Sequence, residues 1–427
     1  MVKITQNVEA AYEIESTYGS PPGSDLYHLG LLDTFDPRQV ERSVTPVPSL
    51  GQSTDTHHAK GPLGVTLPIK VACQGTGWKQ LLGRAIGEST LASYKHGNKL
   101  TTSVDSLAIL ARETGGDFTL VNGVVPNEVT LSADYTTGGY ITVDATCTGY
   151  YSLDESDANF DGFLGDDYSG VSFPASPSDD PLLPTDLSVT VGLAAASNKL
   201  TVDGPSNSSI AVGEQYMRIF DNPTGGLDAS ISSDGILDLT AGAEDTMEEV
   251  KALIHADANW TCSRAGSDVE SKNLLKGLYS TEASQEIFAV DSMAAITNLK
   301  TVSLSIANNN TPIAGRATGD DSSVKWLLNN AISRGKADIT LDLTMTAEDE
   351  TFYDKYHART TIPLIRLDFG SHGSIALTNG TITSFSRPLA PGGEIVDTMS
   401  IKFRGAGNYK NFSAHAISSS ISLNPSG

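Results

Sequence analysis

Regular alternation of apolar and polar residues constrains the fold of this chain more than any other feature. The clearest example is 337–344, where Ala, Ile, Leu and Leu alternate with Asp, Thr, Asp and Thr. Successive side chains of a strand point to opposite faces, so such a segment buries one face and exposes the other to solvent. The same alternation recurs at 65–71, 129–134, 141–147, 302–306 and 398–404. The sequence therefore predicts a mainly β protein with antiparallel sheets.

Few segments have the spacing of a helix. Residues 76–86 place Trp78, Leu81 and Leu82 on one stripe and precede a glycine, which is a helix-stop signal. Further helices are predicted at 246–259 and 322–334, with a helical turn at 347–356. The motifs LLGRAI and LLNNAI in the first and third of these segments echo one another. Either a duplicated strand-plus-helix half or a coincidence explains the echo.

The chain divides by composition into an interrupted domain and an inserted module. Residues 151–186 are acidic and proline-rich and lack periodicity, which is typical of a linker. Predicted strands resume at 187–202 and 208–219, and one predicted helix follows them. We therefore expect a β-rich (α+β) module at 187–284, inserted into a discontinuous domain of residues 1–150 and 285–427.

The net charge disfavours binding to nucleic acid. Aspartate and glutamate number 51 against 28 lysines and arginines, so the formal net charge is −23. Such a chain repels phosphates, and phosphate contacts supply most of the affinity for duplexes. Three interpretations remain: simple solubility, adaptation to high salt, or a surface past which a polyanion slides without adhering.

Membrane and secretory features are missing from the sequence. No run of about 18 apolar residues occurs, so no membrane-spanning helix is expected. The first residues lack the apolar core of a signal peptide, so we do not expect the standard secretory route. Cys73, Cys147 and Cys262 are widely spaced and fit buried thiols better than disulfides or a zinc site.

One segment matches the first half of a calcium-binding loop. Asp157, Asn159 and Asp161 precede Gly162 in the order D-x-N-x-D-G, and oxygens at these positions can converge on a hard cation. The twelfth position is Tyr168 rather than the usual glutamate. A calcium site and a plain acidic surface loop both remain open, and no other cofactor is expected.

No catalytic constellation is evident. The motifs HExxH, GxSxG and CxxC do not occur, and the histidines are scattered. Acidic pairs such as Glu348 and Asp349 read as solvated turns or helix N-terminal charges. We expect a protein that is not an enzyme, although catalytic carboxylates need no local motif and a β-rich hydrolase remains a third possibility.

The order of several motifs resembles that of a known family. The motif SLSIANN at 303–309 is followed by a glycine and an alternating strand at 335–346, by EDETFYDK at 348–355, and by LIRLDF at 364–369. Near the start, ESTYGSPP at 15–22 and the strand and helix of 61–86 complete the pattern. Over about 1–150 and 285–412 the chain resembles the tail tube proteins of tailed viruses.

The resemblance implies both a fold and an assembly. The fold is a β-sandwich with a flanking helix, and subunits form hexameric rings whose strands complete one inner barrel. The rings stack into the virion tail tube, which is assembled in the host cytoplasm and conducts DNA without specific binding and without a membrane. Implied partners are other copies of the chain, tail terminator, baseplate or tip and tape measure proteins, and a sheath protein in contractile tails.

Two further expectations concern orientation within such a tube. Asp338 and Asp342 share the wet face of their strand and either line the bore, where they repel phosphates, or face outer solvent. The module is expected to face outward, since an insertion into the bore blocks DNA. The alternative function is a virion or surface adhesin whose module binds a host receptor or glycan.

Overall fold

The structure is a computed structural model of the chain. It describes residues 8–15, 18–19, 26–35, 40–47, 57–86, 106–112, 118–154, 173–194, 197–206, 208–214, 216–220, 231, 235–281, 283–316, 327–333, 338–389, 393–403 and 419–423.

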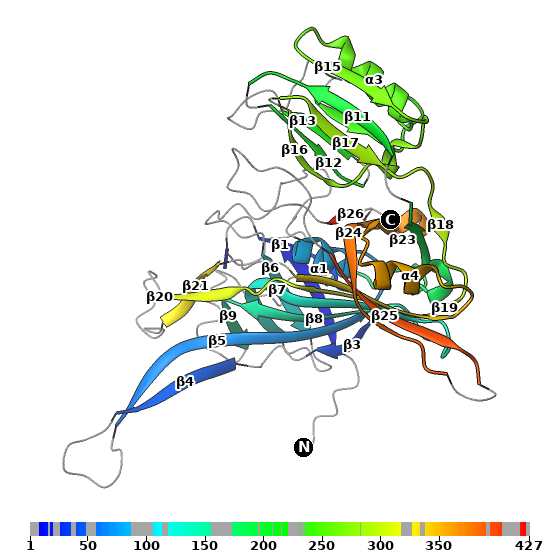
Figure 1. The fold of residues 1–427 in the computed structure, drawn as a ribbon. Helices are drawn as coiled ribbons and strands as arrows, with labels where there is room; N and C mark the ends of the chain where they lie inside the picture. The colour runs from blue at the N-terminus through cyan, green and yellow to red at the C-terminus, as the bar shows by residue number, and fades with distance from the viewer. Residues whose placement is uncertain are drawn as a thin grey trace.

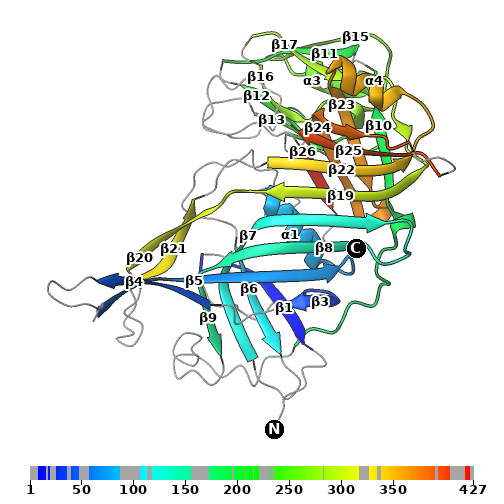
Figure 2. The ribbon, with the colours of Figure 1, turned by 60° about the horizontal axis from the view of Figure 1, so that its bottom comes forward.

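A large antiparallel sheet dominates the molecule (Figure 1), and the predicted mainly β fold is confirmed. Each of its strands pairs with the next along one continuous series (Figure 2). In spatial order they are β5 (His57–Ala72), β8 (Thr142–Gly149), β7 (Phe118–Asp134), β19 (Leu299–Ala307), β22 (Asp338–Thr346), β25 (Val396–Phe403), β24 (Gly373–Ser386), β23 (Ile362–Asp368) and β10 (Ser188–Gly192).

A second layer closes a sandwich over the first half of this series. Strand β7 belongs to both layers, because its second half pairs with β8 and β19 while its first half pairs with β6 and β9. The layer also contains β1, which pairs with β6 and β2. Bounds are β1 (Glu9–Ile14), β2 (Tyr27–His28), β6 (Leu107–Arg112) and β9 (Tyr151–Asp154). Buried apolar residues from both layers form one core.

The two halves of the chain have the same strand pairing. In the first half the order is β5–β8–β7–β6–β1–β2, and in the second it is β22–β25–β24–β23–β10–β18. Strand β26 flanks the first half of β24 as β9 flanks that of β7, and β19 pairs with β22 as β3 pairs with β5. The remaining bounds are β3 (Leu32–Phe35), β18 (Ala294–Ala295) and β26 (Ser419–Leu423).

The irregularities of the two halves also coincide. Strand β7 has a register shift at Asn127 against β8, and β24 has one at Thr383 against β25. A second shift lies at Asp33 in β3 and at Lys300 in β19. Bulges are specific local features, so the chain contains two copies of one unit. We call β1–β9 with α1 the first repeat, and β10 with β18–β26 and α4 the second repeat.

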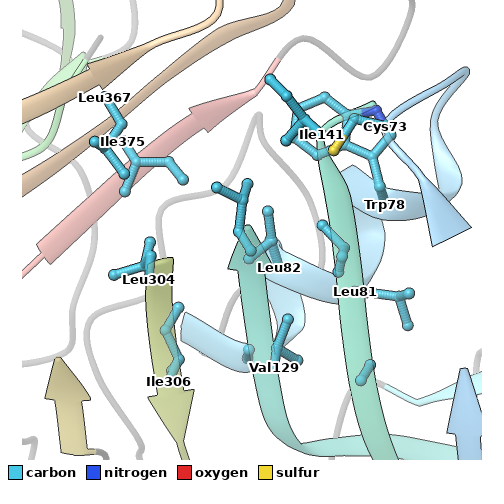
Figure 3. Packing of buried hydrophobic residues seen from close by; sticks show 14 of the residues in the cluster. Cys73, Trp78, Leu81, Leu82, Val129, Ile141, Leu304, Ile306, Leu367 and Ile375 are labelled. Atoms are coloured by element: carbon cyan, nitrogen blue, oxygen red, sulfur yellow. The ribbon is translucent and has the colours of Figure 1, made fainter. Parts of the chain in front are cut away.

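Helix α1 (Gly77–Ile86) confirms the predicted helix at 76–86. Trp78, Leu81 and Leu82 are fully buried and belong to the same core cluster as Leu304 and Ile306 of the second repeat; Figure 3 shows part of this cluster. The helix starts close to the chain before β3: a Cβ on Gly77 would lie 2.0 Å from the carbonyl oxygen of Leu29. Helices α3 (Met247–Ala256) and α4 (Thr351–Ala358) confirm the predictions at 246–259 and 347–356.

The prediction of a helix at 322–334 is wrong for the residues that the structure describes, 327–333. Residues 327–333 form β21 (Leu327–Ser333), which pairs with β20 (Thr311–Arg316) in a hairpin. An apolar stripe fits a helix or a paired strand when it is short, and here pairing with β20 decides. The hairpin corresponds to that of β4 (Val40–Val47) and β5 in the first repeat. The counterpart of α1 is therefore α4, and the echo of LLGRAI and LLNNAI is a coincidence.

The inserted module has a core of its own. Its buried residues run from Leu200 to Ala289 and include Trp260 and Met247. The module contains β11 (Asn198–Asp203), β12 (Ser209–Val212), β13 (Tyr216–Phe220), β14 (Ile236–Asp238), β15 (Thr261–Ala265), β16 (Gly277–Ser280), β17 (Gln285–Ala289) and α3. Its expected start was 187, whereas β10 pairs with β23 and so lies in the large sheet. Within the expected linker, Leu182 exchanges backbone hydrogen bonds with Cys73 and Ile141.

Two further findings concern membranes and thiols. Within the described residues, no helix is long and apolar enough to cross a membrane. Cys73, Cys147 and Cys262 are free and buried, as predicted.

Candidate functional site

The outward surface of the large sheet is lined by hydroxyl groups. Alternate residues of its central strands are buried, as Leu341 and Leu343 are in β22, and the residues between them point away from the core. We call this surface the polar face. Its hydroxyl-bearing residues include Thr130, Ser132, Thr142, Thr146, Ser303, Ser305, Thr340, Thr344, Thr398 and Ser400. Strands of both repeats contribute, and the β7–β19 pair joins them without interruption.

Carboxylates outnumber amines on the described part of the polar face. The carboxylates are Glu128, Asp134, Asp144, Asp338 and Asp342, and the amines are Lys70 and Lys402. A sheet surface with excess carboxylates carries a negative potential that repels anions. The arrangement can therefore exclude a polyanion while the hydroxyl groups keep the surface hydrated.

The two acidic residues predicted from the sequence lie together on this face. Asp338 forms a salt bridge of 2.9 Å with Lys402, and both side chains are about half exposed. Asp342 is exposed and lies between Ser303 and Ser400 of the neighbouring strands. Asp342 therefore contributes its charge to the face more fully than Asp338 does.

Asp134 is held ionised at the edge of the polar face. It accepts hydrogen bonds from the hydroxyl and backbone amide of Thr136, at 2.6 and 2.8 Å. These bonds, led by the hydroxyl, lower the pKa of Asp134 to about 2. Near β3, a hydrogen bond to Asp33 raises the pKa of Lys70. Both groups keep their charges at neutral pH.

The sequence prediction nominated Asp338 and Asp342 but missed Glu128, Asp134 and Asp144. The same alternation that identified β22 also places these three residues on the wet side of β7 and β8. The alternation does not show that β7 and β19 are paired. This pairing joins the solvent-facing sides of the strands into one surface.

The possible calcium ligands Asp157, Asn159 and Asp161 lie outside the described residues. In the part of the chain that the structure describes, no group of three or more His, Cys, Asp or Glu side chains is arranged to hold a metal ion.

The module lies on the side of the sandwich away from the polar face. Strand β23 is buried on both faces: Ile365 and Leu367 belong to the main core, whereas Leu364 packs with Val290 and Met293 beside the module. The layers therefore run from the polar face through the core and β23 to the module, which stands at the top of Figure 1.

A buried ion cluster fastens the module to the sheet. Glu214 of the module is hydrogen-bonded by the Arg366 guanidinium of β23 and lies 3.2 Å from the Lys276 ammonium. Ser374 donates to the same carboxylate at 3.0 Å, and Arg366 donates to the carbonyl oxygen of Lys272 at 2.7 Å. Burial by itself raises the pKa of Glu214, but the two cations Lys276 and Arg366 lower this pKa by more than burial raises it. The net shift of the pKa is therefore downward. Burial lowers the pKa of Lys276 to about 8.

Comparison with known proteins gives a limited result. No family model and no curated protein matches the chain. One similar structure is the tail of an empty GTA particle with C6 symmetry, at 15% identity and a TM-score of 0.21, covering 27% of this chain and 83% of that chain. Another is the virion of a native gene transfer agent particle, at 12% identity and a TM-score of 0.21, covering 27% and 85%.

Proposed function

We propose that this chain is a structural virion protein that polymerises into the tail tube of a tailed virus. The observation that carries the proposal is the polar face, a continuous sheet surface shared by both repeats and rich in hydroxyl groups and carboxylates. The order of family motifs in the sequence supports the same function. Stacked rings would place the sheets around a common bore; the resemblance implies six subunits in each ring.

In this proposal the polar face lines the bore. Asp338, Asp342 and the carboxylates beside them would repel phosphates within about 8 Å, the screening length at physiological salt. DNA would then pass during ejection without specific binding. Hydroxyl groups keep the wall wet and offer no cations for phosphate contacts.

The position of the module supports an outward orientation. It lies beyond β23 on the side away from the polar face, so a bore-facing sheet puts the module on the outside of the tube. We propose that it decorates the tube and that the repeats carry assembly. The chain acts without catalysis, and its partners are other copies, terminator, tip or baseplate and tape measure proteins, with a sheath in a contractile tail.

Negative-stain electron microscopy of the purified full-length chain tests this function. Tubes of uniform diameter with an open bore are expected as the protein is concentrated. Chains that stay monomeric at every concentration and salt would contradict the proposal.

A second candidate is a virion or surface adhesin that binds a host receptor or glycan through the module. The independent core of the module favours it, because such a unit can carry recognition without disturbing the sheet. Monomers that bind host cells or glycans and never polymerise would support the adhesin.

A further inference from the structure

Two strand edges of the large sheet lack a described partner. One is formed by β3 and the start of β4, which pair with β5 alone among the described strands. The other is the second half of β24 (residues 381–386), which lies beyond the pairing with β23 and pairs with β25 alone among the described strands. Open edges present unpaired backbone groups and invite pairing with another chain.

The middle of the sheet shows how these two kinds of edge fit together. The counterpart of β24 is β7, and the counterpart of β3 with the start of β4 is β19. Within the chain β7 and β19 pair from Thr301↔Asp134 to Ala307↔Glu128. The open edge of β24 therefore corresponds to the edge of β7 that β19 covers. The open edge at β3 corresponds to the edge of β19 that does the covering, so the two open edges should fit each other.

The internal pair predicts the register between the two open edges. Ala133 stands six residues after the bulge at Asn127, and Leu389 stands six after the bulge at Thr383. Likewise Val302 stands two residues after Lys300, and Phe35 two after Asp33. Since Val302 pairs with Ala133, Phe35 of one chain is expected opposite Leu389 of the next.

Exposure at this position agrees with a missing neighbour. Ala133 is 3% exposed and Val302 1%, whereas Leu389 is 78% exposed, the highest value among the large apolar side chains described as exposed. Phe35 is only partly buried against the core. A leucine so exposed beside an open strand edge marks an interaction site better than an isolated surface leucine does.

The two helices give independent evidence for a missing neighbour beside the second repeat. Both α1 and α4 begin five residues after the strand that precedes them, β5 and β22 respectively. The sixth residue of α1, Leu82, is fully buried, because α1 lies on β7 and β8 of its own repeat and is also covered by β26 and β19 of the second repeat. The sixth residue of α4, Tyr356, is 39% exposed, and no residue of α4 is buried. Helix α4 lacks the following repeat that covers α1.

We infer that copies of this chain associate head to tail: the β24 edge of one copy, continued to Leu389, pairs with the edge that β3 and the start of β4 present in the next copy. The joint repeats the internal β7–β19 joint, seats Leu389 against Phe35, and covers α4 with the first repeat of the neighbour. The inference deepens the proposed tube function and rests on it only for the closure of rings.

One residue departs from the internal pattern. Arg387 stands where the first repeat has the buried Leu131, and it is bonded to Asp397 and Glu350 of its own chain, at 2.6 Å each. The joint between chains is therefore more polar at this point than the internal one. Such a difference suits an interface that must exist in water before assembly.

Disulfide trapping tests the joint. The double variant Phe35→Cys with Leu389→Cys should form intermolecular disulfides on mild oxidation, because directly paired residues bring their Cβ atoms within bonding range. The native cysteines are buried and should not interfere. The matched control joins Leu389→Cys to Glu286→Cys, since Glu286 is partly exposed on the module, which has a core of its own.

A charge substitution provides the second measurement. Leu389→Asp should abolish assembly at concentrations where the parent assembles while leaving the melting temperature of the monomer unchanged. Thr261→Asp, at an exposed position of β15 in the module, should assemble like the parent. Tubes that form without the Phe35–Leu389 crosslink would overturn the joint and leave the tube function standing. Crosslinked chains that build no tube would support the joint and remove the function. Monomers without crosslinks would overturn both.

Discussion

At the scale of single residues, Glu214 is a buried carboxylate between two cations. Its carboxylate is 4% exposed and faces Lys276 and Arg366, which are themselves buried. The cluster joins the module to β23, so its state determines how firmly the module is held. Removing one partner from such a cluster leaves buried charge without compensation.

We therefore predict that Glu214→Gln lowers the free energy of unfolding by about 3–5 kcal/mol, the range found when one partner of a buried ion pair is removed. Urea denaturation followed by circular dichroism measures the effect. Glu286→Gln is the control, because Glu286 pairs with Lys199 on the surface of the same module and should cost about 1 kcal/mol or less. Equal losses in the free energy of unfolding would show that the buried cluster contributes no more to stability than a surface ion pair does.

Acid should weaken the same contact. The folded-state pKa of Glu214 lies below its ordinary value, so its contribution to stability is complete above about pH 4.5 and is lost as the pH falls through the folded pKa. Denaturation curves below pH 4.5 should show a loss of stability that Glu214→Gln reduces. An identical pH dependence in the parent and the variant would rule out this carboxylate as the cause.

The charge of Asp342 allows a test of the polar face. Asp342→Lys should make tubes assembled in the presence of short duplex DNA retain several-fold more DNA at low salt, since a cation in the bore attracts phosphates. Glu286→Lys makes the same change of charge on the module and should retain no more DNA than the parent. Co-sedimentation of labelled DNA measures retention, and equal retention by both variants would contradict a bore-facing Asp342.

At the scale of elements, the strands followed from alternation, whereas their neighbours did not. Each alternating segment forms a strand over its described residues, because burial of one face decides its conformation. The segment containing Leu327 and Ile332 was misread as a helix because pairing with β20, a tertiary contact, outweighs a short apolar stripe. The repeat was also hidden, since α1 and α4 share their place in the fold but little sequence.

The repeat also indicates that the module is dispensable for assembly. It is inserted between β10 and β18, and the first repeat joins the corresponding strands β1 and β2 through residues 15–26 alone. Replacing residues 193–293 by a flexible loop as long as the segment 15–26 of the first repeat should leave the sheet folded. Tubes should then remain intact by electron microscopy. A variant that keeps the β-sheet circular dichroism spectrum yet fails to assemble would show that the module takes part in building the tube.

At the scale of the whole molecule, the polar face could be predicted only in part. Alternation placed Asp338 and Asp342 on a wet surface, and the structure adds Glu128, Asp134 and Asp144 beside them. The pairing of β7 with β19, which lie far apart in the sequence, depends on tertiary contacts between the repeats that no local pattern contains. The same pairing changes what is expected of a ring.

Because each chain carries two repeats, a ring with six repeats around its bore should contain three chains. Six chains, as the family resemblance implied, would give twelve repeats and a wider tube. Native mass spectrometry of rings released from tubes counts the chains directly. Three chains are the expected result, and six would show that the two repeats do not occupy equivalent places in the ring.

A helical cryo-electron microscopy reconstruction of the assembled chain would test the tube function and the joint together. We expect Asp342 and the hydroxyl groups of β7, β19 and β22 at the wall of the bore, the β24 edge beside β3 and the start of β4 of the next copy, and the module outermost. A map with the module toward the bore, or with the polar face turned to outer solvent, would contradict this arrangement.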